Sequence, residues 1–189
     1  MLLISGPEEL VVATNQAPEP RGNDAVTVRL AVESDAADIS RIHNQGIASR
    51  LATFETVPRT TAAIRGSLLA ADDRHATIVV EKNGVVAAWA SVSAYRSRAC
   101  YAGVGEHSVY VDDRYQKQGL GLIALNALIA ASRERGFWKL VSRIFPENIA
   151  SLRLHERAGF RVVGTYHQHA RLDGEWRDCV IVERLISST

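Results

Sequence analysis

A polar segment with two glycines carries the strongest chemical signal in this 189-residue chain. From Ser108 to Leu122 the sequence reads S-V-Y-V-D-D-R-Y-Q-K-Q-G-L-G-L, so an apolar strand runs into a glycine-containing turn that opens a helix. The first turn of a helix offers unpaired backbone N–H groups and the positive end of the helix dipole, and both attract anions. The segment therefore predicts a site for a phosphate group.

The side chains of this turn fit that interpretation but do not prove it. Gly119 and Gly121 would let a pyrophosphate approach the backbone, and Lys117 and Gln118 could add donors. The pattern lacks the third glycine of a dinucleotide fingerprint, and Leu122 stands where a P-loop has lysine. A tight strand-to-helix turn that binds no ligand is the alternative explanation.

A second polar pattern lies on a shorter helix nearer the C-terminus. Asn148, Ser151 and His155 are spaced by three and four residues, which places them on one helical face. Asn148 is equally suited to cap the start of that helix. These two segments are the candidate functional regions of the chain.

The elements that must position them follow the order β-α-α-β-β-β-α-β-α-β-β. Alternating or apolar runs predict strands at residues 26–31, 77–81, 85–93, 107–111, 140–144, 160–166 and 178–185. Ser34 and Thr60 are expected to cap the first two helices, and Asn83-Gly84 predicts a tight hairpin. The pattern indicates one α/β domain with a mixed, largely antiparallel sheet flanked by helices.

Composition sets the remaining bounds. A hydrophobic share of 47% and a charged share of 23% are typical of one globular domain, expected at residues 26–189 after a flexible N-terminal tail at residues 1–25. The net charge of +1 gives no bulk attraction to nucleic acid or membranes. Two distant cysteines, no secretory signal and no membrane-spanning stretch favour a cytoplasmic protein with free thiols.

Together, the two motifs resemble those of the GNAT superfamily of acyl-CoA transferases. The superfamily's pyrophosphate loop reads Q/R-x-x-G-x-G/A, and its next helix carries Asn and Ser before a Gly-Phe pair. This chain has Q-K-Q-G-L-G at residues 116–121 and N-I-A-S-L-R-L-H-E-R-A-G-F at residues 148–160. The resemblance implies the GNAT fold, a sheet of six to seven strands, with acetyl-CoA as the acetyl donor.

More specifically, the chain resembles the phosphinothricin-type N-acetyltransferases over about residues 28–185. The supporting segments are T-F-E-T at 53–56, G-E-H-S-V-Y-V at 105–111, R-L-H-E at 153–156 and G-E-W-R-D at 174–178. This resemblance implies acetylation of the α-amine of a small glutamate-like amino acid of the phosphinothricin, arsinothricin or methionine sulfoximine class. It also implies a homodimer with a detoxifying, antibiotic- or herbicide-resistance role.

The resemblance assigns catalytic roles to Glu106 and His155. An ammonium has no lone pair, so the acceptor must lose a proton before it attacks the thioester, and Glu106 is the expected base. His155 is expected either to protonate the leaving thiolate or to take part in a proton relay. The alternatives are an exposed carboxylate at a strand end and an ordinary half-buried histidine.

Binding residues are implied in the same way. Val109, Tyr110 and Val111 are expected to pair with the pantetheine arm through their backbone. The other expected contacts to the donor are Gln116, Lys117, Gln118, Gly119, Leu120, Gly121, Leu122, Asn148 and Ser151. For the acceptor they are Phe54, Arg74, Glu106 and Trp176, although a core phenylalanine and a solvated arginine are alternatives.

A metal site is rejected, and two other functions compete with the proposed acetylation of an amino acid. His167 and His169 alternate along a strand, but without a third ligand at suitable spacing no metal site is expected. A GNAT enzyme could instead acetylate a protein N-terminus or an aminoglycoside. A CoA-binding module without turnover is the second possibility.

Overall fold

Seven strands form one twisted sheet in the order β1-β2-β3-β4-β5-β7-β6. The computed structural model describes residues 25–186, so the predicted tail lies outside the described residues except for Ala25. The strands are β1 (Val26–Leu30), β2 (Thr77–Lys82), β3 (Val85–Ala94), β4 (Val104–Val111), β5 (Lys139–Ile144), β6 (Arg161–Leu172) and β7 (Glu175–Leu185). All neighbours are antiparallel except β4 and β5, which confirms the mixed sheet expected from the sequence.

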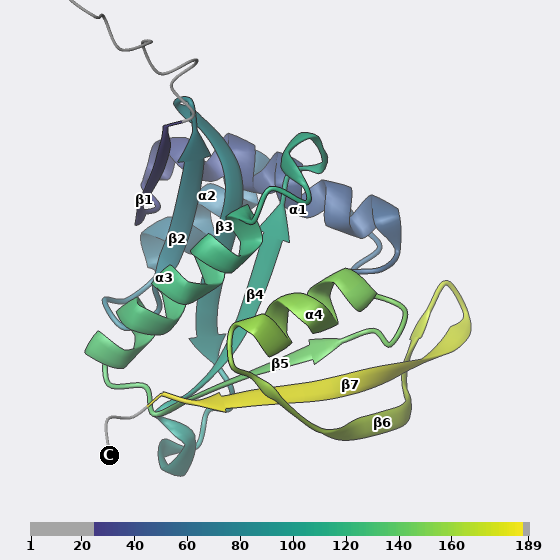
Figure 1. Ribbon diagram of the computed structural model, residues 1–189. Helices are drawn as coiled ribbons and strands as arrows, with labels where there is room; N and C mark the ends of the chain where they lie inside the picture. The colour runs from purple at the N-terminus through teal and green to yellow at the C-terminus, as the bar shows by residue number, and fades with distance from the viewer. Residues whose placement is uncertain (1–24, 187–189) are drawn as a thin grey trace, which may run out of the picture.

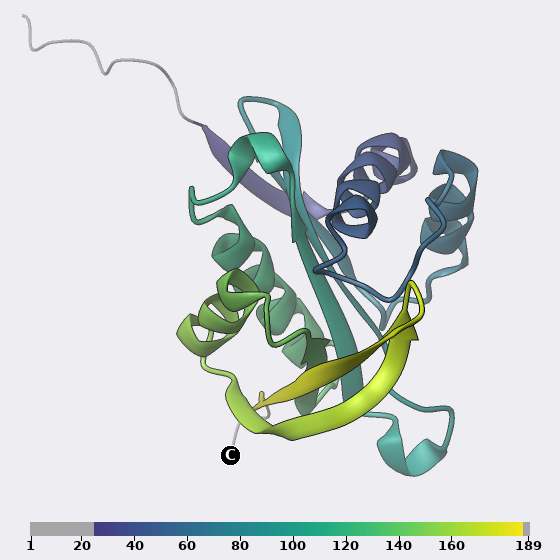
Figure 2. The same cartoon turned by 90° about the vertical axis from the view of Figure 1, so that its right-hand side faces the viewer.

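Helices cover both faces of this sheet (Figure 2). One face carries α1 (Ala36–Ser49) and α2 (Thr61–Ala70), and the other carries α3 (Leu120–Glu134) and α4 (Ile149–Arg157). Within residues 25–186 there are also three short 3₁₀ turns, namely η1 (Glu33–Asp35), η2 (Ala99–Tyr101) and η3 (Asp113–Tyr115). The predicted order of helices and strands is confirmed.

The central strands are apolar on both sides because both sides are covered. On β2, Val79 packs toward α1 and α2, whereas its neighbour Val80 packs toward α3. On β3, Trp89 and Ala88 divide in the same way. The sheet therefore packs against one hydrophobic cluster on each face.

The predicted helix cap at Thr60 and the predicted turn at Asn83-Gly84 are confirmed, whereas the predicted cap at Ser34 is wrong. Thr60 Oγ1 accepts a hydrogen bond of 3.1 Å from Ala63 N, as a cap does, and Asn83-Gly84 forms the β2–β3 turn with positive φ at both residues. Ser34, in contrast, lies inside η1 and does not cap α1. Asp35 takes that position, and its carboxylate is held by Arg29 at 2.7 Å.

The last hairpin is longer than predicted. Strand β6 continues past Tyr166 to Leu172, and β7 already begins at Glu175. Asp173-Gly174 forms the turn with φ of 51° and 88°, the conformation a two-residue hairpin requires. Much of β6 is exposed, and its sequence H-Q-H-A-R has no alternating hydrophobic pattern from which a strand could be predicted. Figure 1 shows this hairpin extending beyond the end of β5.

Candidate active site

Strands β4 and β5 separate after a short stretch of pairing. The parallel register joins Val104–Glu106 to Lys139–Val141, and beyond it the two strands diverge (Figure 1). At the point of separation, Ser142 Oγ donates a hydrogen bond of 3.1 Å to the His107 carbonyl. Among the described strands, the far half of β4 is thus paired with β3 alone. Its other edge can accept an extended ligand arm in the manner of an added strand.

The turn that leads from η3 into α3 lies beyond the end of β4. Lys117 and Gly119 both have left-handed φ, of 60° and 81°, and residues 116–119 are exposed. The first N–H groups of α3 have no acceptor within the helix, so this exposed start suits an anion. Gln116 Nε2 donates to Asp113 Oδ1 at 2.7 Å, and Gln118 Oε1 accepts from Lys82 Nζ at 2.8 Å. These two glutamine side chains brace the turn.

The two glycines of the motif have different roles. A side chain on Gly119 would meet open space, so its backbone conformation is the reason for glycine there. A Cβ on Gly121 would lie 2.6 Å from Leu154 Cδ1 and 3.1 Å from Val111 Cγ2. Gly121 is buried and lets α3 approach α4 and β4 closely, a packing role that the sequence does not distinguish from ligand contact. Leu120 is buried beside it and Leu122 partly buried.

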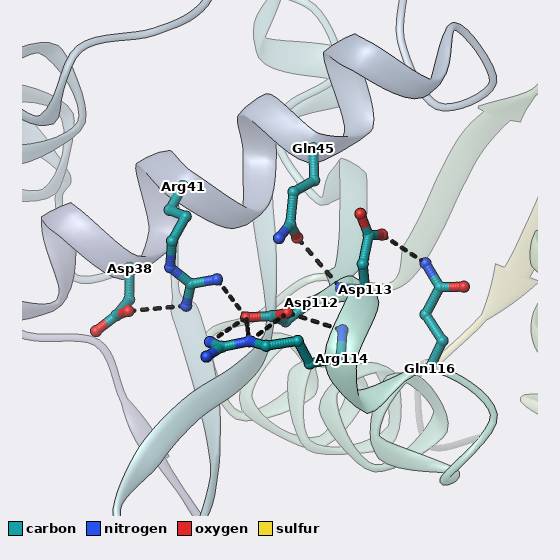
Figure 3. A network of polar contacts seen from close by, with 7 residues as sticks. All are labelled: Asp38, Arg41, Gln45, Asp112, Asp113, Arg114 and Gln116. Carbon is teal, nitrogen blue, oxygen red and sulfur yellow. Dashed lines mark hydrogen bonds and ion pairs between the residues drawn. The ribbon is translucent and has the colours of Figure 1, made fainter.

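An ion-pair network anchors the turn to α1 (Figure 3). The fully buried Asp112 carboxylate accepts from Arg41 on α1 and from Arg114 Nη2 at 2.7 Å. Hydrogen bonds from Arg114 and Arg41 outweigh the effect of burial and hold the pKa of Asp112 well below its usual range. Gln45 Oε1 also accepts from Asp113 N at 3.3 Å. The sequence analysis missed this network, because Arg41 and Asp112 are far apart in the chain.

A cavity of about 870 Å³ opens on the α1 and α2 face of β4. Glu106, Ser108 and Tyr110 alternate along β4 and line it. Phe54 forms part of the wall and meets Phe145 edge-to-face, with ring centroids 4.8 Å apart. The other lining side chains include His43, Glu55, Arg59, Trp89, Arg143 and Cys179. The structure therefore brings Glu106 and Phe54 into one space, as the motifs predicted, and adds two arginines.

Glu106 is paired with an arginine that the sequence analysis did not single out. Arg143 on β5 donates to Glu106 Oε1 from Nε at 2.8 Å and also from Nη2. The Glu106 side chain is 25% exposed and that of Arg143 is 48% exposed, so the pair is open to solvent. A carboxylate held at the mouth of the strand gap can accept a proton from an amine that enters the cavity.

His155 lies on the opposite face of β4 from the Glu106 side chain. It is 2% exposed, and its Nδ1 is 2.7 Å from the Ser151 carbonyl, so Nδ1 carries the proton. Its Nε2 lies 2.9 Å from His107 Nε2 and accepts from it. Burial lowers the pKa of both imidazoles, that of His107 to about 3, and Phe160 packs against both rings. The structure thus contains a neutral, buried histidine pair behind the strand.

Asn148 and Ser151, the other two residues of the predicted polar face, meet at the N-terminus of α4. Asn148 Oδ1 accepts from Ser151 N at 3.0 Å, which is a helix cap, and Asn148 Nδ2 donates to the Leu51 carbonyl at 3.0 Å. Asn148 thereby ties α4 to the loop that follows α1 and leads to Phe54. Both arms of its amide are used, so the structural role that the sequence allowed for Asn148 is present.

Two residues expected at the acceptor lie outside this cavity. Arg74 Nη2 donates to the Ala102 carbonyl at 2.7 Å, and its guanidinium lies over the Phe137 ring. Trp176 is half exposed near the β6–β7 turn and stacks with Arg171. Arg74 is not among the residues that line the space beside Glu106, and its acceptor role stays a prediction. Arg59 and Arg143 are the arginines that line this space.

Comparison with known proteins agrees with this arrangement of strand gap, glycine turn and carboxylate. Residues 47–160 match the family model described as Acetyltransferase (GNAT) family. An acetyltransferase from Salmonella typhimurium, solved with acetyl-CoA, superposes with a TM-score of 0.81 at 31% identity over 87% of this chain and 96% of its own. The chain belongs to the GNAT acetyltransferase family, and its acetyl donor is acetyl-CoA.

Three of the similar proteins have names that state the amine they acetylate. The phosphinothricin N-acetyltransferase of Streptomyces viridochromogenes is 33% identical over 86% of this chain and 87% of its own length. The L-methionine sulfoximine/L-methionine sulfone acetyltransferase of Salmonella typhimurium is 33% identical over 84% of this chain and 93% of its own. A phosphinothricin acetyltransferase from Sinorhizobium meliloti, solved with AcCoA, has a TM-score of 0.78 at 27% identity, covering 86% and 89%.

Two further features of residues 25–186 bear on membrane insertion and metal binding. No helix in this range is both long and apolar enough to cross a bilayer. In the same range, no group of three His, Cys, Asp or Glu side chains is arranged so that it could hold a metal ion.

Proposed function

We propose that the protein acetylates the α-amine of a small, glutamate-like amino acid of the phosphinothricin, arsinothricin or methionine sulfoximine class. The observation that carries this proposal is the Glu106 carboxylate, which lines a cavity at the gap between β4 and β5. The cavity volume of about 870 Å³ is within the range of small-molecule sites. The named relatives that act on phosphinothricin and methionine sulfoximine support the same choice.

The donor-binding residues follow from the strand gap and the turn. Acetyl-CoA supplies the acetyl thioester. The unpaired edge of Val109, Tyr110 and Val111 would hold its arm and offer an N–H to the carbonyl oxygen on which negative charge develops. The exposed start of α3 would hold the diphosphate, with Lys117 and Gly119 setting the turn and α4 forming the adjacent wall.

Glu106 is the proposed base. It accepts the proton of the substrate ammonium, directly or through one water, and so frees the nitrogen lone pair. The new N–C bond forms as the C–S bond breaks, and the thiolate takes up a proton on leaving. Phe54 and Phe145 shield one side of the cavity from water, which strengthens the interaction between Glu106 and the ammonium.

His155 is the second proposed participant. Its lowered pKa disfavours the imidazolium that a proton donor requires, so a neutral role in a relay with His107 fits the structure better than a standing acid. In this role the His107–His155 hydrogen bond provides a path along which a proton can move on the α4 side of β4.

The wider setting is proposed from the same resemblance. The protein would be a cytoplasmic homodimer that detoxifies an antibiotic or herbicide amino acid. Exposed apolar side chains on the last hairpin, among them Val162, Val163 and Leu185, supply surface that a second copy could cover. Light scattering at micromolar concentration tests the dimer, which a monomeric mass would exclude.

A thiol-release assay tests the activity. Purified protein with acetyl-CoA is offered phosphinothricin, arsinothricin, methionine sulfoximine and methionine sulfone in parallel. We expect turnover with at least one of them and a mass increase of one acetyl group on its amine.

The same assay includes the competing acceptors. A peptide with a free N-terminal alanine and an aminoglycoside are run beside the amino acids, because a solved ribosomal-protein-alanine N-acetyltransferase from Brucella melitensis shares the fold at 28% identity and a TM-score of 0.81. Turnover restricted to either of these would replace the proposed substrate class. Acetyl-CoA binding with no turnover on any acceptor would indicate a silent binding module.

A further inference from the structure

We infer that the Glu106–Arg143 ion pair is a template for the α-amino acid zwitterion and makes Arg143 the residue that selects acceptors by their α-carboxylate. The inference rests on the proposed function and extends it to the recognition of the amino-acid backbone. In the structure the two side chains form an ion pair with each other. In the substrate complex the ammonium would take the place of Arg143 at Glu106, and the carboxylate would take the place of Glu106 at Arg143.

The geometry of the pair leaves room for this exchange. Both hydrogen bonds from Arg143 end on the same oxygen, Glu106 Oε1, from Nε and Nη2. Among the described residues, Glu106 Oε2 and Arg143 Nη1 have no hydrogen-bond partner. An ammonium can therefore approach Oε2, and a carboxylate oxygen can approach Nη1, before the original pair separates. A guanidinium fork then binds the carboxylate with two parallel hydrogen bonds.

The strand arrangement fixes the backbone positions from which the two charged side chains extend. Glu106 is opposite Val141 in the parallel register, and Arg143 follows two residues later on the same side of β5. β4 and β5 diverge from this point (Figure 1). The ion pair joins the two side chains across the opening gap. A second cavity of about 450 Å³ shares Glu106, Ser142 and Arg143 with the first, so the pair lies at the junction of both.

The neighbouring ion pair behaves differently. Arg59 binds Glu55 with two hydrogen bonds, of 2.7 Å from Nε to Oε2 and 2.5 Å from Nη2 to Oε1. Both carboxylate oxygens of Glu55 are thus engaged by one guanidinium, and the pair is closed within a single loop. Of the two Glu–Arg pairs in the cavity, only Glu106–Arg143 presents a free oxygen and a free nitrogen.

Charge balance would then favour amino acids over simple amines as acceptors. A zwitterion brings one positive and one negative group, bonded to the same carbon, so neither Glu106 nor Arg143 loses its partner on binding. An amine without a carboxylate would bind Glu106 and leave the Arg143 guanidinium unpaired in a cavity from which water is being displaced. Because the pair is partly exposed, its own attraction is weak enough for exchange to be easy.

The test compares one acceptor with its amide. Methionine sulfone and methionine sulfone α-carboxamide share the amine and the side chain and differ only at the carboxylate. Steady-state kcat/KM is measured for wild type, Arg143→Gln and Arg143→Lys with both acceptors. For Arg143→Gln we expect a loss of about 100-fold with the acid, mainly in KM, and a change of less than about threefold with the carboxamide. Arg143→Lys should retain part of the preference for the acid.

Controls separate the inference from general damage. Arg65→Gln removes a half-exposed arginine that pairs with Glu33 at 3.3 Å outside both cavities, and it should leave both rates unchanged. Retained carboxamide turnover shows that Arg143→Gln is folded. Equal losses with acid and carboxamide would overturn the template. If the wild type turns over another of the four proposed acceptors but not methionine sulfone, that acid and its α-carboxamide are compared instead. Wild type inactive on all four acids would refute the proposed function, and the inference with it.

Discussion

At position 106 a carboxylate and an amide differ in proton affinity far more than in shape. We therefore expect Glu106→Gln to lower kcat by about 10²- to 10⁴-fold, the usual contribution of a general base. Acetyl-CoA binding should be nearly unchanged, because the proposed donor contacts lie on the β4 edge and at the start of α3. Kinetics and isothermal titration calorimetry measure the two effects.

Glu156→Gln is the matched control for this substitution. Glu156 is an exposed glutamate on α4 next to His155, so its replacement should change neither quantity. If Glu106→Gln turned over at the wild-type rate from pH 6 to pH 9, Glu106 would lose the role of base.

The buried histidine pair predicts a loss of stability in mild acid. The unfolded chain takes up a proton on His107 near its ordinary pKa of 6.5, whereas in the folded protein burial lowers that pKa to about 3. Stability is therefore complete above pH 6.5 and declines as the pH falls toward 3. Between pH 7 and pH 5 the single-site loss is on the order of 1–2 kcal/mol.

His107→Gln isolates that contribution, since its amide can still donate to His155 Nε2. Urea unfolding at pH 7 and pH 5 should show a smaller difference in the free energy of unfolding than in wild type. An equal difference in the two proteins would mean that the pair is not the source of the acid sensitivity.

A motif was enough to predict that two site residues lie close together, although their roles stay predictions. Glu106 and Phe54 stand in short segments, and the structure places both in one cavity. Arg143 was missed because its meaning depends on the β4–β5 register, which brings together residues from distant parts of the chain. The contacts of Arg74 were also not predictable from its local sequence, because Ala102 and Phe137 are distant from it in the chain.

At the scale of elements, β4 is packed too closely for any added side chain at Gly105. A Cβ there would lie 2.4 Å from Val92 Cγ2, 3.0 Å from Leu140 Cδ2 and 3.1 Å from Phe137 Cδ1, and all three side chains are buried. We expect Gly105→Ala to destabilise the protein by about 1–3 kcal/mol, as overpacking does. Chemical denaturation measures the change.

Gly66→Ala provides the opposite case. Gly66 lies inside the exposed part of α2 with nothing within 4 Å of an added Cβ. The higher helix propensity of alanine should stabilise the protein by about 0.5–1 kcal/mol. Destabilisation by Gly66→Ala, or neutrality of Gly105→Ala, would contradict this account of the packing.

Element prediction succeeded where burial imposes a pattern and failed where it does not. The strands covered on both faces are continuous apolar runs, so β2 and β3 were found almost to the residue. The exposed hairpin of β6 and β7 carries polar residues on both sides, and its full length was not apparent. Ser34 was taken as a cap because the sequence could not show that Arg29 holds Asp35.

At the scale of the whole molecule, Asp112 joins three elements that are distant in the chain. Asp112 directly follows β4 and forms ion pairs with Arg41 of α1 and Arg114 of η3 (Figure 3). Arg114 lies just before the glycine turn. Asp112→Asn leaves both guanidinium groups underpaired, and their partial exposure moderates the cost to about 1–3 kcal/mol. Because the turn would lose its anchor, we also expect acetyl-CoA affinity to fall by about tenfold.

Thermal unfolding and calorimetry with acetyl-CoA measure both quantities. Asp113→Asn serves as the control, since Asp113 is exposed and its replacement keeps an acceptor for Gln116. Reduced stability with unchanged donor affinity would show that the network supports the fold without organising the turn.

The gap beside β4 has a consequence for the life of the protein in a cell. If acetyl-CoA occupies this gap as proposed, the folded protein is most stable when acetyl-CoA is abundant. A ligand that binds only the folded form raises the free energy of unfolding as its concentration rises above its Kd. At a concentration 100 times its Kd, acetyl-CoA should add about 2.7 kcal/mol, which raises Tm by roughly 5–10 °C for a chain of this size. Differential scanning fluorimetry across a concentration series would show this rise, and a flat response would exclude it. Nutrient-rich cells would then hold more of this enzyme from the same message, simply because less of it unfolds.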